Sequence, residues 1–186
     1  MKIISLAACA LLALSLQVSA QAPAAAGAIK LGKVQPAVVK TPEFTLKSGG
    51  DKRSKPGDWL EIEVEFDTKG GDIDELTLEY TVQVENKLLE GQVTHVMIPP
   101  GREHFSVMYV SPRSLDKLTG GKALNASSIQ NAWIIAKIKG QIVDQAAFRR
   151  EAIPNLQKTP GMLLNKAETP FAPLYFDRYE AIKAGK

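Results

Sequence analysis

The chain has 186 residues, of which 45% are hydrophobic and 23% charged, and it contains a single cysteine. This length suits one domain with a buried core. The 23 Lys and Arg residues nearly balance the 20 Asp and Glu residues, so charge gives no reason to expect a nucleic-acid partner or an acidic membrane surface.

The first twenty residues have the parts of a secretory signal peptide. Lys2 precedes an apolar run over residues 3–16, and a small-x-small ending predicts cleavage after Ala20. The run is shorter than the ~20 apolar residues that cross a bilayer, so we expect no transmembrane span in the mature chain. Lipidation at Cys9 is the alternative, but it would leave only Ile3–Ala8 as the apolar region, below the roughly 7–15 residues of an export signal.

Cleavage after Ala20 would remove the only cysteine, Cys9. The mature chain would then have no disulfide, no thiol nucleophile and no thiolate metal site. Its 22 Lys and Arg (23 less Lys2) against 20 Asp and Glu leave a net charge of +2. A disulfide-free exported chain fits a bacterial envelope.

Residues 21–42 are rich in Ala and Pro without a sustained period, so we expect a linker, with a short strand at most at Ala37–Lys40. From residue 43 to 149 the hydrophobic pattern alternates, as strands with one buried face do. The expected strands are Glu43–Lys47, Trp59–Asp67, Leu76–Glu85, Gln92–Ile98, His104–Val110, Ala132–Lys139 and Gln141–Phe148.

A short helix is expected before the sixth of these strands. Ser111 can cap its N-terminus, Pro112 suits its first position and Gly120 suits its end, while Leu115 and Leu118 lie on one face. About seven short strands with frequent turn signals predict an all-β fold, an immunoglobulin-like β-sandwich. The cysteine pair of antibody domains is missing, so the inference extends to the architecture only.

Residues 150–186 form a C-terminal extension that is unusually aromatic for a tail. It contains Phe171, Tyr175, Phe176 and Tyr179 within a short stretch, whereas disordered tails are poor in aromatic residues. We expect it to dock on the sandwich itself, covering an edge or an open end of the core. The alternative is a partner protein, and these four residues are the candidate partner-binding site.

The stretch WLEIEVEFD, residues 59–67, raises the question of chemistry. Glu61, Glu63 and Glu65 have the ~6.6 Å spacing of alternate strand residues, which also falls in the range of glycosidase carboxylates. Every acidic strand meets that spacing, so we interpret these acids as the solvent face of a strand. Asp72 and Asp74 alternate as calcium ligands do, but the glycines precede them and a solvated turn is the favoured interpretation.

The two histidines could face each other if the strands containing His95 and His104 pair as a hairpin. A two-histidine metal site still needs a third ligand, because Glu103 points away from His104 in an extended chain. The chain has no G-x-S-x-G elbow, P-loop or dinucleotide fingerprint. We therefore expect no enzyme activity, no catalytic residue, no cofactor and no metal.

The segments THVMIPPGREHFSVMYVSPRSLDKLTGG and ETPFAPLYFDRYEAIK resemble a family of exported pilus-like proteins encoded beside type IV pilus machinery in verrucomicrobial bacteria. The resemblance covers about residues 44–182. It implies an outer-membrane-associated protein with an immunoglobulin-like fold related to archaeal type IV pilus subunits, and it brings no cofactor or catalytic residue.

One departure from the pilin pattern limits this expectation. A filament-forming pilin keeps its apolar helix after processing, whereas here the apolar run ends at the expected cleavage site and no acidic residue appears before Glu43. We therefore expect an exported protein that is pilus-associated or surface-exposed, with the periplasm as the alternative location. Its partner would be a protein of a pilus-like or outer-membrane assembly, rather than copies of itself in a filament.

Two other functions remain open at this stage. A carbohydrate-binding or adhesive sandwich could recognise a ligand through exposed aromatic residues such as Trp59 or Tyr175. A hydrolase could use the acidic strand, and only loss of a measured activity on Glu63→Gln would support it. The expected primary function is a non-enzymatic structural or interaction module.

Overall fold

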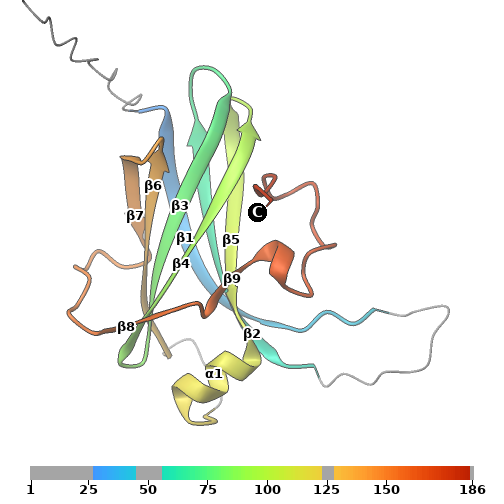
Figure 1. Ribbon diagram of the computed structural model, residues 1–186, viewed down its shortest axis with the longest axis vertical. Coiled ribbons are helices and arrows are strands. Elements are labelled where there is room, and N and C mark those ends of the chain that lie inside the picture. Colours follow the sequence, from blue (N-terminus) through green and yellow to red (C-terminus); the bar gives the residue numbers. More distant parts are fainter. Residues whose placement is uncertain (1–26, 45–55, 123–127, 185–186) are drawn as a thin grey trace, which may run out of the picture.

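The computed structural model describes residues 27–44, 56–122 and 128–184. Two sheets pack face to face as a sandwich (Figure 1). Sheet A has the order β1-β2-β5-β9 and sheet B the order β7-β6-β3-β4-β8. The elements are β1 Ile29–Lys40, β2 Asp58–Thr68, β3 Ile73–Val84, β4 Lys87–Ile98, β5 Gly101–Val110, α1 Pro112–Thr119, β6 Ile129–Ile138, β7 Gln141–Ala147, β8 Gln157–Pro160, β9 Leu163–Asn165 and the 3-10 turn η2 Lys166–Glu168.

The strand order confirms the immunoglobulin-like sandwich. In chain order, β1, β2 and β5 take the places of strands A, B and E, and β7, β6 and β3 those of G, F and C, with β4 added beside β3. Each of these pairs is antiparallel. The parallel pairing of β8 with β4 and the pairing of β9 with β5 extend the pattern.

The alternation in the sequence correctly predicts the core. Leu60, Ile62, Val64 and Phe66 of β2 are fully buried, and so are the alternate residues of β3 from Leu76 to Val84. They meet between the sheets in one continuous cluster. Full burial of a side chain of this size contributes about 1.5–3 kcal/mol, so the two strands form the centre of the stabilising core.

The expected linker over residues 21–42 is wrong from Ile29 onward, because Ile29–Lys40 is a long strand paired with β2. Its register shifts between Leu31 and Val34. This irregularity breaks the alternation that would reveal a strand in the sequence. Pro36 is tolerated because β1 is an edge strand of its sheet.

Two other N-terminal predictions fall wholly or partly outside the described residues. The signal peptide, including Cys9, lies within residues 1–26, which the structure does not describe. Of the expected strand Glu43–Lys47, the two described residues, Glu43 and Phe44, are not in a strand.

The strands of His95 and His104 do not pair as a hairpin, the condition considered for a facing pair of histidines. β4 belongs to sheet B and β5 to sheet A, so the chain crosses between the sheets at Pro99 and Pro100. Neither proline can donate to a strand ladder, which suits a connection that leaves one sheet for the other. Both histidines still face the interior and are buried.

The helix and the last hairpin agree with the sequence. The Ser111 hydroxyl accepts a hydrogen bond from the Ser114 amide, Gly120 ends α1 in the left-handed conformation, and Leu115 is buried. β6 and β7 pair around Gly140, whose φ of 78° also suits glycine.

Among the described residues, no helix has the length and apolar character needed to cross a membrane.

The sandwich does not end at residue 149. β8 adds to the edge of sheet B and β9 to the edge of sheet A, so the C-terminal extension contacts both sheets. Leu163 of β9 is buried in the main core, where it lies against Gly91 of β4. A Cβ at Gly91 would approach that of Leu163 to 2.6 Å, so this glycine makes room for the extension. Docking on its own sandwich is what the sequence led us to expect.

Candidate functional site

The last part of the chain, residues 169–184, which we call the C-terminal segment, lies against sheet A on its outer side (Figure 1). Bridges connect Tyr179 with Phe105 of β5 and Ile182 with His95 of β4. The Lys183 amide also donates to the Thr94 carbonyl at 2.8 Å. The segment therefore contacts β5 of sheet A, and its end also pairs with β4 of sheet B.

Three aromatic rings in mutual contact attach the start of this segment. The Phe171 ring lies parallel to that of Tyr109 at 4.5 Å, and both meet the Trp59 ring edge to face at 5.6 and 6.4 Å. All three side chains are buried. The Trp59 indole N–H donates to the Thr41 hydroxyl at 3.0 Å. Trp59 is thus a packing residue, and its expected role as an exposed ligand-reading aromatic is wrong.

A second attachment forms around Glu63. The Arg178 guanidinium donates to both of its carboxylate oxygens, at 2.7 and 3.1 Å, and the Tyr179 hydroxyl donates to one at 2.7 Å. Arg178 also lies 3.7 Å from the centre of the Phe105 ring. The hydrogen bonds with Glu63 raise the pKa of Arg178 above its usual range. Glu63 therefore holds the C-terminal segment in place and does not face open solvent as predicted.

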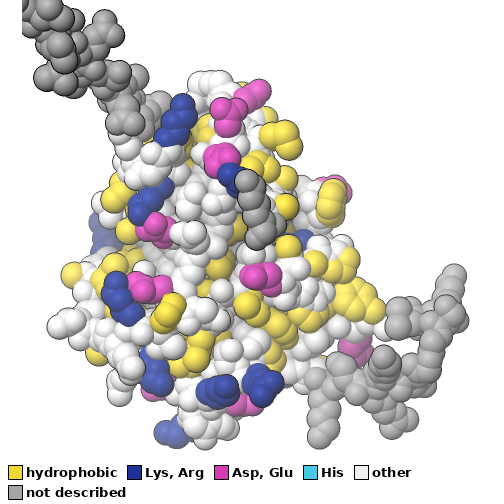
Figure 2. Space-filling view, viewed as in Figure 1, with side chains coloured by type: hydrophobic (Ala, Val, Ile, Leu, Met, Phe, Trp, Pro, Cys, Tyr) yellow, Lys and Arg dark blue, Asp and Glu magenta, His cyan; other side chains and the backbone are white. Residues whose placement is uncertain are grey.

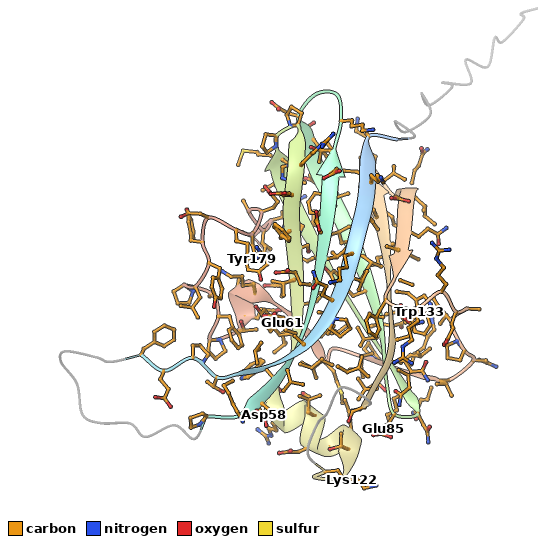
Figure 3. All side chains as sticks on the ribbon, turned by 180° about the vertical axis from the view of Figure 1, so that it is seen from behind. Asp58, Glu61, Glu85, Lys122, Trp133 and Tyr179 are labelled. Carbon is orange, nitrogen blue, oxygen red and sulfur yellow. The ribbon has the colours of Figure 1, made fainter. Side chains whose placement is uncertain are left out.

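A cavity of about 650 Å³ lies between the end of β1, the outer face of β2 and the C-terminal segment. Val39 and Lys40 line one side, and Leu174, Tyr175 and Tyr179 the other. Glu61 and Glu63 lie on its β2 side. In Figure 3, Glu61 and Tyr179 lie on the same side of the sandwich, away from Trp133 of β6. The cavity combines apolar walls with a carboxylate floor.

Glu61 differs from its neighbour Glu63 because no described residue forms an ion pair with it. Burial raises the pKa of Glu61, and the Glu63 carboxylate raises it further. The Tyr109 side chain stands directly across from Glu61 in the β2–β5 ladder. Its hydroxyl is close enough to lower the pKa of Glu61, yet it makes no hydrogen bond of acceptable geometry in the described chain. The half-buried Glu61 carboxylate and the buried Tyr109 hydroxyl thus lie close together, and of the two only Glu61 lines the cavity.

The four candidate partner-binding residues divide into two pairs. Phe171 is buried and Tyr179 is half-buried, so both serve to dock the segment. Tyr175 and Phe176 are 63% and 82% exposed. They border a second, shallower cavity of about 520 Å³ beside Phe105. Hydrophobic side chains gather on the right-hand side of Figure 2, where Figure 1 shows the C-terminal segment. Of these four residues, Tyr175 and Phe176 are therefore the two whose side chains face solvent.

Sequence reasoning did not find the association of Glu61, Glu63 and Arg178. Arg178 is 115 residues from Glu63, and nothing local in either segment indicates the other. The aromatic content of the tail was the only signal, and it correctly indicated docking.

The other candidate ligands remain apart. Among residues 27–44, 56–122 and 128–184, no group of three His, Cys, Asp or Glu side chains could hold a metal ion. Asp72 and Asp74 lie in the exposed β2–β3 region. His104 pairs with the Glu180 carboxylate at 2.6 Å, and its ring stacks on Phe66 at 5.3 Å.

His95 belongs to a buried hydrogen-bond chain between the sheets. Its Nε2 lies 2.7 Å from the Ser106 hydroxyl, which accepts from the Tyr80 hydroxyl at 2.8 Å. Its Nδ1 lies 3.2 Å from the Glu180 carbonyl, which ties the C-terminal segment into the chain. Burial lowers the pKa of His95, so the folded protein holds this imidazole neutral.

The neutral His95 predicts acid sensitivity. Its pKa is lower in the folded than in the unfolded chain, so the unfolded chain binds more protons once the pH falls below about 6.5. The free energy of unfolding should therefore decrease from this pH downward, by at most about 1.4 kcal/mol per pH unit from this group. Urea unfolding at pH 7.5 and 5.5 measures the change. His95→Gln should reduce the decrease, and an equal decrease in both proteins would contradict the assignment.

Comparisons with known proteins agree with this architecture. A protein-family model matches residues 20–186 of the chain, and no curated protein matches it. Three solved chains match. One of them is the crystal structure of a protein from Akkermansia muciniphila, with a TM-score of 0.74 and 24% sequence identity over 85% of this chain and 94% of that chain. At this identity the likeness shows a shared fold.

Proposed function

We propose that this chain, which belongs to the protein family whose model spans residues 20–186, is a non-enzymatic, exported structural or interaction protein of the cell surface. The observation that carries the proposal is that two aromatic residues of the C-terminal segment attach it to the sandwich, while two others face solvent. Phe171 and Tyr179 fix the segment on sheet A, and they present Tyr175 and Phe176 to solvent between them. Tyr175 has a positive φ of 53°, a conformation that a non-glycine residue adopts at some energetic expense.

The partner would be a protein of a pilus-like or outer-membrane assembly. The sequence resemblance to pilus-like proteins supports this, as does the shared fold with a protein from a verrucomicrobium. Cleavage after Ala20 would remove the apolar run of residues 3–16, whereas a filament-forming pilin keeps its apolar helix. We therefore propose a pilus-associated protein and not the filament subunit.

A carbohydrate-binding function is the second candidate, and the 650 Å³ cavity is what favours it. Tyrosine rings can stack on the face of a sugar, and adjacent carboxylates can accept hydrogen bonds from its hydroxyl groups. Binding to a glycan array that survives Phe176→Ala, outside the cavity, and is lost with Glu61→Gln, inside it, would favour this candidate over the protein partner.

Replacing Tyr175 and Phe176 together by alanine tests the protein-partner function. Exposed aromatic anchors at an interface typically contribute 2 kcal/mol or more, so we expect affinity for the partner to fall by at least about tenfold. The melting temperature should change little because both side chains are exposed.

A photo-crosslinking amino acid at position 175, introduced in the source bacterium, identifies the partner. The expected product joins this protein to an envelope or pilus component. The control places the same group at Ile142, which is 57% exposed on β7 in the other sheet. Equal crosslinking at both positions, or crosslinks to cytoplasmic proteins alone, would overturn the proposal.

A further inference from the structure

The end of the C-terminal segment, residues 178–183, which we call the closing segment, joins the edges of the two sheets. β8 pairs with β4 at Lys87–Glu90, and β9 pairs with β5 at Met108–Val110. Further along the same two strands, the closing segment forms bridges to His95 of β4 and Phe105 of β5. It therefore adds backbone to the edge of each sheet, as an extended peptide does in β-strand addition.

The side chains of the closing segment are matched to groups on the sandwich. The polar pairs are Arg178 and Tyr179 with Glu63, Glu180 with His104, and Lys183 with Glu75. Between them, Ile182 packs against the main core. Cations of the segment thus meet carboxylates, its carboxylate meets an imidazole, and its apolar residue meets apolar residues. The groove between β4 and β5 is therefore specific for this sequence, which a second copy of the chain also carries.

The connection that leads from Phe171 to the closing segment is folded back and strained. The Leu174 amide donates to the Phe171 carbonyl at 2.9 Å. The Arg178 amide donates to the Tyr175 carbonyl at 3.1 Å, and Tyr175 has a φ of 53°, which is unfavourable for a residue with a side chain. Extended, residues 172–177 would reach roughly 20 Å. Opening this connection would release the strain and carry the closing segment to a neighbouring molecule.

We propose that two copies of this chain exchange their closing segments, so that residues 178–183 of each copy close the sandwich of the other. The contacts between segment and sandwich are retained, while both strained connections are opened. Each copy gives one segment and receives one, which makes a closed dimer with two-fold symmetry and leaves no segment to extend a filament. This inference goes beyond the proposed partner function and is tested on the purified protein without a partner.

Sedimentation velocity of the mature chain, equilibrated a few degrees below its melting temperature, measures the exchange. A segment on a short flexible connection has an effective concentration of about a millimolar at its own groove, so an unstrained chain would dimerise near that concentration. Strain in both copies opposes closure, and we therefore expect a dissociation constant of about 100 μM or below. A monomer alone up to about 1 mM, or a series of species larger than a dimer, would overturn the proposal.

Tyr175→Gly tests the role of the connection, with Tyr175→Ala as its matched control. Both variants lose the aromatic ring, but glycine adopts a positive φ freely and alanine does not. The glycine variant should therefore close on itself more readily. We expect its dimer to dissociate at least about tenfold more readily than that of Tyr175→Ala. Equal dissociation constants for the two variants would overturn the proposal.

A charge reversal shows whether the closing segment is what passes between copies. Glu63→Arg places two guanidinium groups together, and Arg178→Glu places two carboxylates together, so neither variant closes well on itself. In a mixture, the groove of the first variant receives the segment of the second with opposite charges. The other groove and segment of the pair keep the native Glu63 and Arg178. We expect the mixture to dimerise at least about tenfold more tightly than either variant alone, and a mixture as monomeric as its components would overturn the proposal.

The ion pair between Glu79 and Lys137 provides the matched control. Their charged groups lie 2.5 Å apart on β3 and β6, which stay within one copy during the exchange. Glu79→Lys and Lys137→Glu should therefore dimerise no more tightly when mixed than they do alone. A gain equal to that of the Glu63→Arg and Arg178→Glu mixture would mean that opposite charge alone drives the association, and it would overturn the exchange.

Discussion

A chain that lacks Met162–Lys186 is expected not to fold cooperatively. The deletion removes Leu163 from the main core and Phe171 from the aromatic stack on sheet A. Removing a buried leucine side chain costs about 2–5 kcal/mol and a buried phenylalanine about 3–5 kcal/mol. Together these losses approach the 5–15 kcal/mol of a typical domain. The loss of amide dispersion in an NMR spectrum and of a thermal transition in circular dichroism would show it.

A shorter deletion provides the control. Removing Lys183–Lys186 takes away the exposed ion pair between Lys183 and Glu75 and the bond from the Lys183 amide to Thr94. Such surface contacts contribute about 1 kcal/mol or less each, so this chain should fold. A cooperative transition in the longer deletion, close to that of the full protein, would contradict the role assigned to the C-terminal segment. Partner binding therefore has to be tested with point variants.

Phe171→Ala is expected to lower the free energy of unfolding by about 3–5 kcal/mol. The ring is 5% exposed, and its loss would leave a void beside the Tyr109 and Trp59 rings. Urea unfolding monitored by the fluorescence of the tryptophans measures the change. The emission of Trp59 in the folded protein should also shift to longer wavelength, because water would then reach its indole ring.

Phe176→Ala controls for the loss of a phenyl ring from the same segment. Phe176 is 82% exposed, and exposed positions of this kind change stability by about 0.5 kcal/mol or less. If Phe171→Ala and Phe176→Ala had the same effect, the aromatic stack would not be what attaches the segment to sheet A.

The sequence was sufficient for the elements whose pattern is local. The strict alternation around Ile62 and Tyr80 predicts β2 and β3, and both residues are buried as expected. The capping residues Ser111 and Gly120 predict α1 within a residue of its bounds. In each case, a side-chain period or a cap decides the structure, and neighbours in the chain are enough to show it.

It was not sufficient where distant contacts decide the structure. The bulge after Leu31 hides β1 from any test of alternation, and pairing with β2 is what makes the segment a strand. Glu63 looked like a solvent-facing acid because Arg178 comes from another part of the chain. The sequence also did not predict that β5 lies in the other sheet from β4. The two prolines between them indicate a turn, but a turn can connect strands of one sheet or of two.

The placement of β8 and β9 has a consequence for the order of folding. These strands occupy the edges of the two sheets, and they are synthesised after β1 to β7. When the ribosome has produced β1 to β7, Gly91 of β4 is not yet covered by Leu163, and Tyr109 of β5 is not yet covered by Phe171. Long-range pairings of this kind form slowly. The sandwich should therefore stay incomplete until β8 and β9 have left the ribosome and paired with β4 and β5.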